Sequence, residues 1–186
     1  MSDVEDPGWK PALKGIPSAL IPMYSLRRAT RESNGLVALR TMWVTFLSGI
    51  VLIGIVVLAL WPSLRQGGPD ARVVAGIVVA IALVTHLAAR LVPQISGHDD
   101  ADVRASAQRR FLLRVALAES SALIGFVSFI ITENPAVYFV GAVAAVAALL
   151  QVCPSSAWLE REQRQLRAAG SSVNLLAALL SGGLTR

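Results

Sequence analysis

The chain has 186 residues, of which 54% are apolar and 16% are charged, and its mean hydropathy is +0.60. Soluble domains are about 45–50% apolar and about 25% charged, so both values shift toward a protein solvated by lipid. The composition excludes an intrinsically disordered chain and a collagen, and the single cysteine, Cys153, excludes a disulfide-stabilised mini-protein. A formal charge of +5 suggests a nucleic-acid partner only if the charges gather on a soluble domain, so their positions decide its meaning.

Residues 1–40 are predicted to form a proline-punctuated segment in the cytoplasm or at the membrane interface. Four prolines between residues 7 and 22 prevent one continuous helix. Trp9 and Tyr24 are apolar and aromatic anchors, and the cations Arg27 and Arg28 follow them. Such anchors suit either anionic lipid headgroups or a groove on a partner protein. We therefore take these four residues as candidate interface anchors.

Four apolar runs follow, and we predict that each forms a transmembrane helix, at about residues 41–61, 72–92, 111–132 and 135–153. The uncharged stretch 41–60 would be about 30 Å long as a helix, which matches the hydrocarbon thickness of a bilayer. The runs are apolar around the whole helix, and a soluble protein of this length cannot bury four such helices. The sequence therefore predicts an all-α, polytopic membrane protein with four transmembrane helices. Only Glu133 and Asn134 separate the last two, which predicts a tight hairpin.

The distribution of Lys and Arg predicts the orientation of these helices. Fifteen of the 17 cations fall in the N-terminal segment, the connection between the second and third helices, and the tail, and only Arg65 and Arg72 fall in the first loop. Because positively charged short loops stay in the cytoplasm, both termini are expected to be cytoplasmic. The excess of positive charge then reflects the orientation of the helices in the membrane, and no nucleic-acid partner is expected. The preference for Arg, Ala and Val is typical of GC-rich bacteria such as actinobacteria, which indicates a bacterial plasma membrane.

The tail, residues 154–186, is expected to carry two short amphipathic helices in the cytoplasm. Ser155 or Ser156 can cap the first helix, Trp158 is its main apolar anchor, and Gly170 can end it. In the second helix, one stripe is spaced i, i+3, i+4, i+7 and consists of Val173, Leu176, Ala177 and Leu180. Trp158, Leu176 and Leu180 are therefore candidate anchors, either for the lipid interface or for another subunit.

Glu119 is the main candidate for chemistry, because it lies about 12 Å into the third transmembrane helix. A carboxylate at that depth is costly and usually faces a helix bundle or an ion pathway, so Glu119 is expected to be either a proton or ion site or a structural hydrogen-bonding group. His86 is the one histidine expected inside the membrane, and an intramembrane haem normally needs two. The acidic group 98–102 is read as a solvated turn rather than a cation site. No cofactor and no bound metal are expected.

Three pairs of small residues spaced four apart are expected to let helices approach closely. They are Gly76 and Ala80, Ser121 and Gly125, and Gly141 and Ala145.

The stretch QRRFLLRVALAESSALIGFV, residues 108–127, resembles the second helix of subunit c of rotary ATP synthases. In that family a mid-membrane carboxylate precedes a glycine in an alanine-rich helix, and the resemblance implies a proton-carrier role for Glu119 alone. The second half of the chain, with CPSSAWLEREQRQL, is more similar to a loosely defined group of uncharacterised bacterial four-helix integral membrane proteins of the actinobacterial kind.

These features favour a non-enzymatic accessory or stabilising subunit of a larger bacterial membrane complex, for example a lipid importer or a respiratory complex. The expected partners are other integral membrane subunits and anionic lipid headgroups. The alternative is a small oligomeric channel or carrier for ions or protons that uses Glu119.

Overall fold

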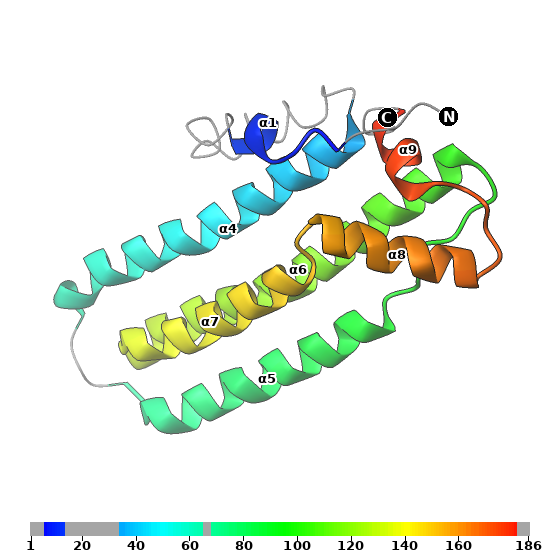
Figure 1. Ribbon diagram of the computed structural model, residues 1–186. Helices are drawn as coiled ribbons and strands as arrows, with labels where there is room; N and C mark the ends of the chain where they lie inside the picture. Colours follow the sequence, from blue (N-terminus) through cyan, green and yellow to red (C-terminus); the bar gives the residue numbers. More distant parts are fainter. Residues whose placement is uncertain (1–5, 14–33, 65–67, 182–186) are drawn as a thin grey trace. The chain divides into compact units, whose positions relative to one another are not determined.

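The computed structural model describes residues 6–13, 34–64 and 68–181, and every regular element in these ranges is a helix (Figure 1). The all-α class is thereby confirmed for the described residues. The elements are α1 (Lys10–Leu13), α4 (Gly35–Leu60), the 3-10 helix η1 (Trp61–Ser63), α5 (Ala71–Leu91), α6 (Asp100–Thr132), α7 (Pro135–Gln151), α8 (Ser156–Ala168) and α9 (Leu175–Leu180).

Three of the described helices are long and apolar enough to cross a membrane: α4 with η1, α5 and α6. A fourth crossing requires α7 to be counted together with α8, which follows it after a break. α7 alone is too short to count as a crossing, because its 17 residues extend about 25 Å, somewhat less than the thickness of the hydrocarbon core. The described residues therefore include three or four helices that could cross a membrane, where the sequence predicted four.

Two of these helices begin well before their apolar runs. α4 starts at Gly35, where the Asn34 side chain accepts hydrogen bonds from the amides of Leu36 and Val37, so residues 35–40 do not belong to an irregular segment. α6 starts at Asp100 instead of residue 111, and the Asp99 carboxylate caps it by accepting from the amide of Asp102. Charged residues end an apolar run without ending a helix, because a charged side chain disrupts no backbone hydrogen bond.

The chain divides into two compact units, to both of which α4 and α6 contribute. The first unit consists of Met1–Thr45, Pro93–Leu112 and Val152–Arg186, and the second of Phe46–Val92 and Leu113–Gln151. The second unit lies within the predicted transmembrane domain. The first unit joins parts of all three predicted regions, because it also takes in the start of α4 and the connection between α5 and α6.

In the second unit, α6 and α7 are in close contact through small residues. A side chain on Gly141 would place its Cβ only 3.0 Å from the Cα of Gly125 and closer still to the carbonyl oxygen of Ser121. Two of the three predicted small-residue pairs therefore lie in one helix–helix contact. The tight hairpin is confirmed too, since Glu133 turns the chain with a φ of 55° and Asn134 caps α7.

Polar contacts of side chains with backbone or with other side chains also link the remaining helices of the second unit. The Tyr138 hydroxyl on α7 donates to the carbonyl oxygen of Ile50 on α4, at 2.5 Å. The hydroxyls of Thr85 on α5 and Ser121 on α6 lie 3.3 Å apart. α5 also packs along α7, and its outward face is apolar and exposed.

In the first unit, the tail forms two helices that are tied together. Ser155 caps α8 by accepting from the amide of Trp158, and the chain leaves the helix through Gly170, whose φ is +85°. The Gln163 side chain donates to the carbonyl of Val173 and accepts from the amide of Leu175, at the start of α9. The predicted cap and stop of the first tail helix are confirmed.

Candidate functional site

Glu119 lies on α6 at the border between its inward and outward faces. Its neighbours on the inward side, Ala118 and Ala122, are buried, whereas Ala116 and Leu123 on the outward side are exposed. The Glu119 side chain is half-buried and makes no hydrogen bond or ion pair with any residue that the structure describes. A carboxylate in a mostly apolar surrounding with no polar partner is costly in hydrocarbon, which makes Glu119 the strongest candidate site.

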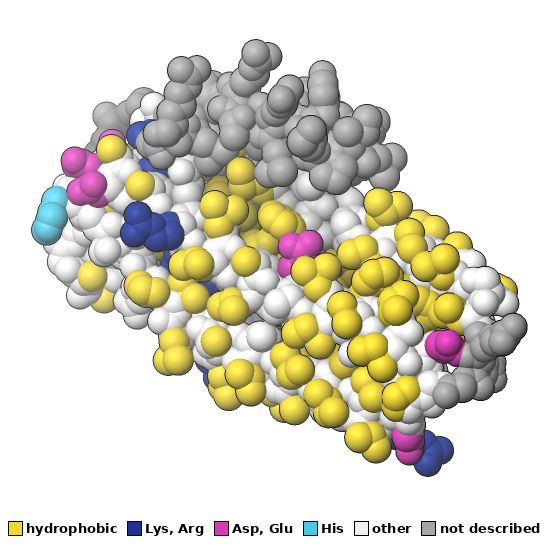
Figure 2. Space-filling model, turned by 180° about the vertical axis from the view of Figure 1, so that it is seen from behind, with side chains coloured by type: hydrophobic (Ala, Val, Ile, Leu, Met, Phe, Trp, Pro, Cys, Tyr) yellow, Lys and Arg dark blue, Asp and Glu magenta, His cyan; other side chains and the backbone are white. Residues whose placement is uncertain are grey.

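Glu119 lies at the edge of an outward surface of the second unit that is mostly apolar. Exposed aliphatic side chains follow α6 at helical spacing, and α4, α5 and α7 add more of them. Figure 2 shows a face on which apolar side chains gather over the helices, while the acidic side chains are few and separate. This surface suits lipid or other membrane helices.

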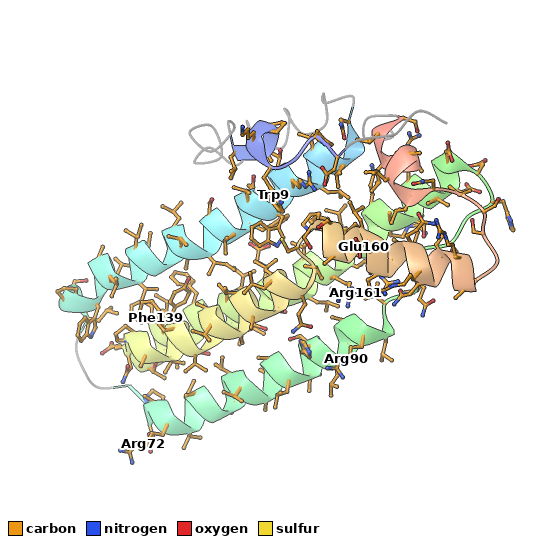
Figure 3. All side chains as sticks on the ribbon, in the orientation of Figure 1. Trp9, Arg72, Arg90, Phe139, Glu160 and Arg161 are labelled. Carbon is orange, nitrogen blue, oxygen red and sulfur yellow. The ribbon has the colours of Figure 1, made fainter. Side chains whose placement is uncertain are left out.

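His86 lies on α5 and contacts the cation one turn further along its own helix. Its Nε2 atom is 3.5 Å from Nη2 of Arg90, which lies near the end of α5 (Figure 3). Arg72 lies near the other end. The ring of His86 is half-buried, and the structure describes no hydrogen bond between His86 and Glu119. A contact between the hydroxyls of Thr85 and Ser121 links their two helices.

Arg40 is the most deeply buried cation of the described chain, with 1% of its surface exposed. Its guanidinium forms a two-pronged pair with the Asp6 carboxylate, at 2.6 and 2.7 Å, and donates to the carbonyl oxygens of Gly8 and Pro154. The Trp9 ring lies 5.1 Å from the guanidinium carbon. One side chain thus holds the N-terminal residues against α4 and the start of the tail, which is typical of a structural centre.

The Asp6 carboxyl responds to this pairing. Its pKa lies below the ordinary value of 3.8, mainly because the Arg40 side chain donates hydrogen bonds to the charged form, and partial burial opposes the shift. Sequence reasoning missed the Arg40 cluster, since it treated Arg40 as a cation outside the first membrane helix. A cation only one residue before an uncharged helical run, with carboxylates earlier in the chain, was the available signal.

Of the predicted N-terminal anchors, Trp9 is described and packs inside the first unit. Its ring makes an edge-to-face contact with Trp43 on α4, with centroids 5.7 Å apart, and Figure 3 shows it directed toward that helix. Trp9 is therefore half-buried against its own chain rather than fully presented to lipid. Tyr24, Arg27 and Arg28 lie outside the described residues.

The predicted anchors of the tail differ in how far they are buried. Trp158 is buried against the first unit on the inner face of α8, together with Leu159 and Leu166. In α9 the residues buried within the chain are Leu175, Ala178 and Leu179 rather than those of the predicted stripe, and the role of Leu176 and Leu180 as anchors for lipid or another subunit stays a prediction. The helix begins at Leu175, so Val173 precedes it, and Leu176 and Leu180 are only half-buried beside the packed face. Because this segment is short and almost entirely apolar, a stripe shifted by one residue fits the pattern of an amphipathic helix almost equally well.

A second buried charge pair joins α6 to α8. Nη1 of Arg110 lies 3.4 Å from Oε2 of Glu162, and the Glu162 side chain is 2% exposed. The opposite face of α8 is basic and exposed, with Arg161 labelled in Figure 3 and Arg164 and Arg167 following at helical spacing. α8 is therefore amphipathic, as predicted, with a buried acid that the sequence did not indicate.

The described residues offer no group of three or more His, Cys, Asp or Glu side chains that would hold a metal ion. Asp99 caps α6, so the acidic group belongs to a helix start rather than to a turn alone. The second unit has a hollow of about 340 Å³ lined by polar and apolar residues, among them Trp61, Glu133 and Asn134. It also has an apolar groove of about 600 Å³ between α4 and α7, lined by Gly54 and Phe139 among others.

No family model, no curated protein and no solved structure matches the chain.

Proposed function

We propose that the chain is a non-enzymatic accessory or stabilising subunit of a larger bacterial plasma-membrane complex, with both termini in the cytoplasm. The observation that carries this proposal is the construction of the first unit. Three separate segments of the chain are tied together there by buried polar contacts, centred on Arg40 and on the Arg110–Glu162 pair. About half of the chain thus forms a unit with its own specific polar contacts, which suits a role in holding other subunits.

The first unit has an exposed basic face on α8 that suits the cytoplasmic surface of a membrane. The exposed cations of α8, Arg161, Arg164 and Arg167, lie opposite its buried apolar face. A helix of this kind lies in the interface, and each cation near anionic headgroups contributes on the order of 1 kcal/mol. The strong bias of Lys and Arg toward the same segments supports the cytoplasmic orientation.

The proposal predicts which variants release partner subunits. A tagged chain purified from its native membranes in mild detergent is expected to co-elute with larger membrane subunits in a fixed ratio. Arg40→Ala, which leaves Asp6 unpaired and frees the N-terminal residues, is expected to lose them. The matched control Arg72→Gln, at the exposed end of α5, is expected to keep them. Recovery of this chain alone from wild-type membranes, by mass spectrometry of the eluate, would contradict an accessory role.

A second function, transport of protons or ions through Glu119, is favoured by one observation, the lack of a described polar partner for this carboxylate. Carboxylates inside the membrane often belong to proton relays. In proteoliposomes, Glu119→Gln is then expected to abolish flux, and Glu160→Gln, on the exposed face of α8, is expected to leave it unchanged. Equal flux in all three proteins, or none in the wild type, would rule out transport by this chain.

A further inference from the structure

Glu119 and His86 lie at nearly the same depth in the second unit. The Thr85–Ser121 contact fixes the level of α5 relative to α6, and the two helices run antiparallel (Figure 1). His86 follows Thr85 by one residue, and Glu119 precedes Ser121 by two. At 1.5 Å per residue, both are displaced in the same direction, by about 1.5 and 3 Å, so their levels agree to within about 2 Å.

The two side chains nevertheless point away from each other within one copy. Successive residues of a helix are turned by about 100°, so Glu119 lies about 200° around α6 from Ser121, on the side away from α5. His86 lies about 100° around α5 from Thr85, beside the exposed residues Val79 and Leu83. An acid and a base therefore occupy two different outer flanks of the same unit, at one depth.

We propose that a second copy of the chain completes this site, with Glu119 of one copy bonded to His86 of its neighbour. Copies that share a membrane orientation are related by rotation about the membrane normal, and this rotation preserves depth. Groups at equal depth on two different flanks are therefore what a head-to-tail contact between copies requires, and a repeated contact of this kind closes into a ring if the angle permits. Arg90, in contact with the His86 ring, adds positive charge on the receiving flank.

Small residues on the exposed face of α5 next to the His86 flank are compatible with this pairing. With the level set by Thr85 and Ser121, Gly76 and Ala80 lie at the levels of Ile130 and Phe126 of α6. Gly76 and Ala80 are turned about 80° and 120° around α5 from His86, and Ile130 and Phe126 about 20° around α6 from Glu119. Gly76 and Ala80 are exposed, and a side chain added at Gly76 would meet nothing within 4 Å. Unlike the other two predicted pairs, this pair faces outward in the part of the chain that the structure describes, so a neighbouring helix can approach closely there.

Cysteine crosslinking in native membranes tests the contact directly. In a Cys153→Ser background, two differently tagged chains are co-expressed, one with Ile130→Cys and one with Gly76→Cys, so that Glu119 and His86 stay intact. Oxidation is expected to give a disulfide between the two tags. The mismatched pair Ile130→Cys with Leu87→Cys, about 16 Å apart in level, is the control and is expected to give none. Equal yields for matched and mismatched pairs, or no crosslink between copies, would overturn the proposal.

A second crosslinking experiment tests whether Glu119 and His86 stabilise the contact between copies. Glu119→Leu in the Ile130→Cys chain, paired with the Gly76→Cys chain, is expected to lower the crosslink yield by at least about threefold. Exchange of the two residues, Glu119→His with His86→Glu in both chains, is expected to restore it. An unchanged yield, or crosslinking of Ile130→Cys to a different protein instead of a second copy, would contradict self-association. The result is independent of whether other subunits co-purify, so it does not depend on the accessory role.

Discussion

The two units of the chain differ in whether their charged side chains have partners within the chain. In the first unit, the buried groups Arg40 and Glu162 are each bound to an opposite charge within the same chain. In the second unit, single hydroxyls make polar contacts between the apolar helices, and the one carboxylate of the α6 flank, Glu119, has no described partner. The first unit therefore pairs its buried charges Arg40 and Glu162 within the chain, whereas we propose that Glu119 of the second unit is paired only by a second copy.

The largest expected effect comes from Arg40→Ala, which tests the pairing of buried charges inside the first unit. The substitution removes the charged partner of Asp6, which keeps only the Gly8 amide as a donor, and the donor to the Pro154 carbonyl; because Arg40 is buried and Asp6 is partly exposed, we expect a cost of about 3 kcal/mol. We expect a lower free energy of unfolding in detergent and faster hydrogen exchange in residues 6–13. Exchange that stays as slow as in the wild type would show that Arg40 does not hold this segment.

The next largest effect concerns the close contact of the second unit. Gly141→Ala forces α6 and α7 apart, because its Cβ has no room between Ser121 and Gly125, and overpacking of this kind costs about 1–3 kcal/mol. Gly76→Ala, at an open position, is the control, and in detergent-dispersed single copies it should gain up to about 1 kcal/mol from helix propensity. Thermal unfolding followed by circular dichroism measures both. Equal melting temperatures for the two variants would refute the close approach.

A smaller effect is expected from the hydroxyl that fixes the level of α5. Thr85→Ala removes the contact with Ser121, and hydrogen bonds between membrane helices contribute about 0.6 kcal/mol on average. Thr45→Ala is the matched control, because its hydroxyl donates to the carbonyl of Thr41 on its own helix. If the control destabilises the protein as much as Thr85→Ala does in the same unfolding assay, the α5–α6 bond is not a stabilising contact.

The smallest expected effect is the pH dependence that Asp6 contributes. Because its pKa is lowered in the folded protein, its contribution to stability is present above the ordinary value of 3.8 and is lost as pH falls through the lowered pKa. The melting temperature of the wild type should therefore exceed that of Asp6→Asn at neutral pH and approach it in acid. A difference between the two proteins that does not vary with pH would contradict a charged Asp6–Arg40 pair.

The contrast between the units also explains how much of the molecule can be read from the sequence. Apolar runs, small-residue pairs and helix caps are local patterns, so the helices of the second unit, the hairpin at Glu133 and the ends of α8 are predictable. Contacts across long separations are not, because nothing in the chain pairs Asp6 with Arg40 or Arg110 with Glu162 in advance. The early start of α6 was missed because hydropathy follows side chains and not the backbone hydrogen bonds that continue the helix.

Some features of the candidate site can likewise be predicted from the sequence, whereas others cannot. Its residue types and approximate depth follow from the sequence, and Glu119 and His86 are identified by charge within apolar runs. Which way each side chain points depends on the level and rotation of neighbouring helices. That information comes from the Thr85–Ser121 contact, which is one weak polar pair among many possible ones.

The claim that the second unit is incomplete in a single copy is tested most directly by the mass of the assembly ejected from its native membrane. Native mass spectrometry of membrane vesicles that contain the tagged chain measures this without a detergent step. We predict an assembly with at least two copies of the chain together with larger subunits. A single copy that leaves the membrane alone, in the same preparation in which other membrane complexes remain intact, would contradict the claim.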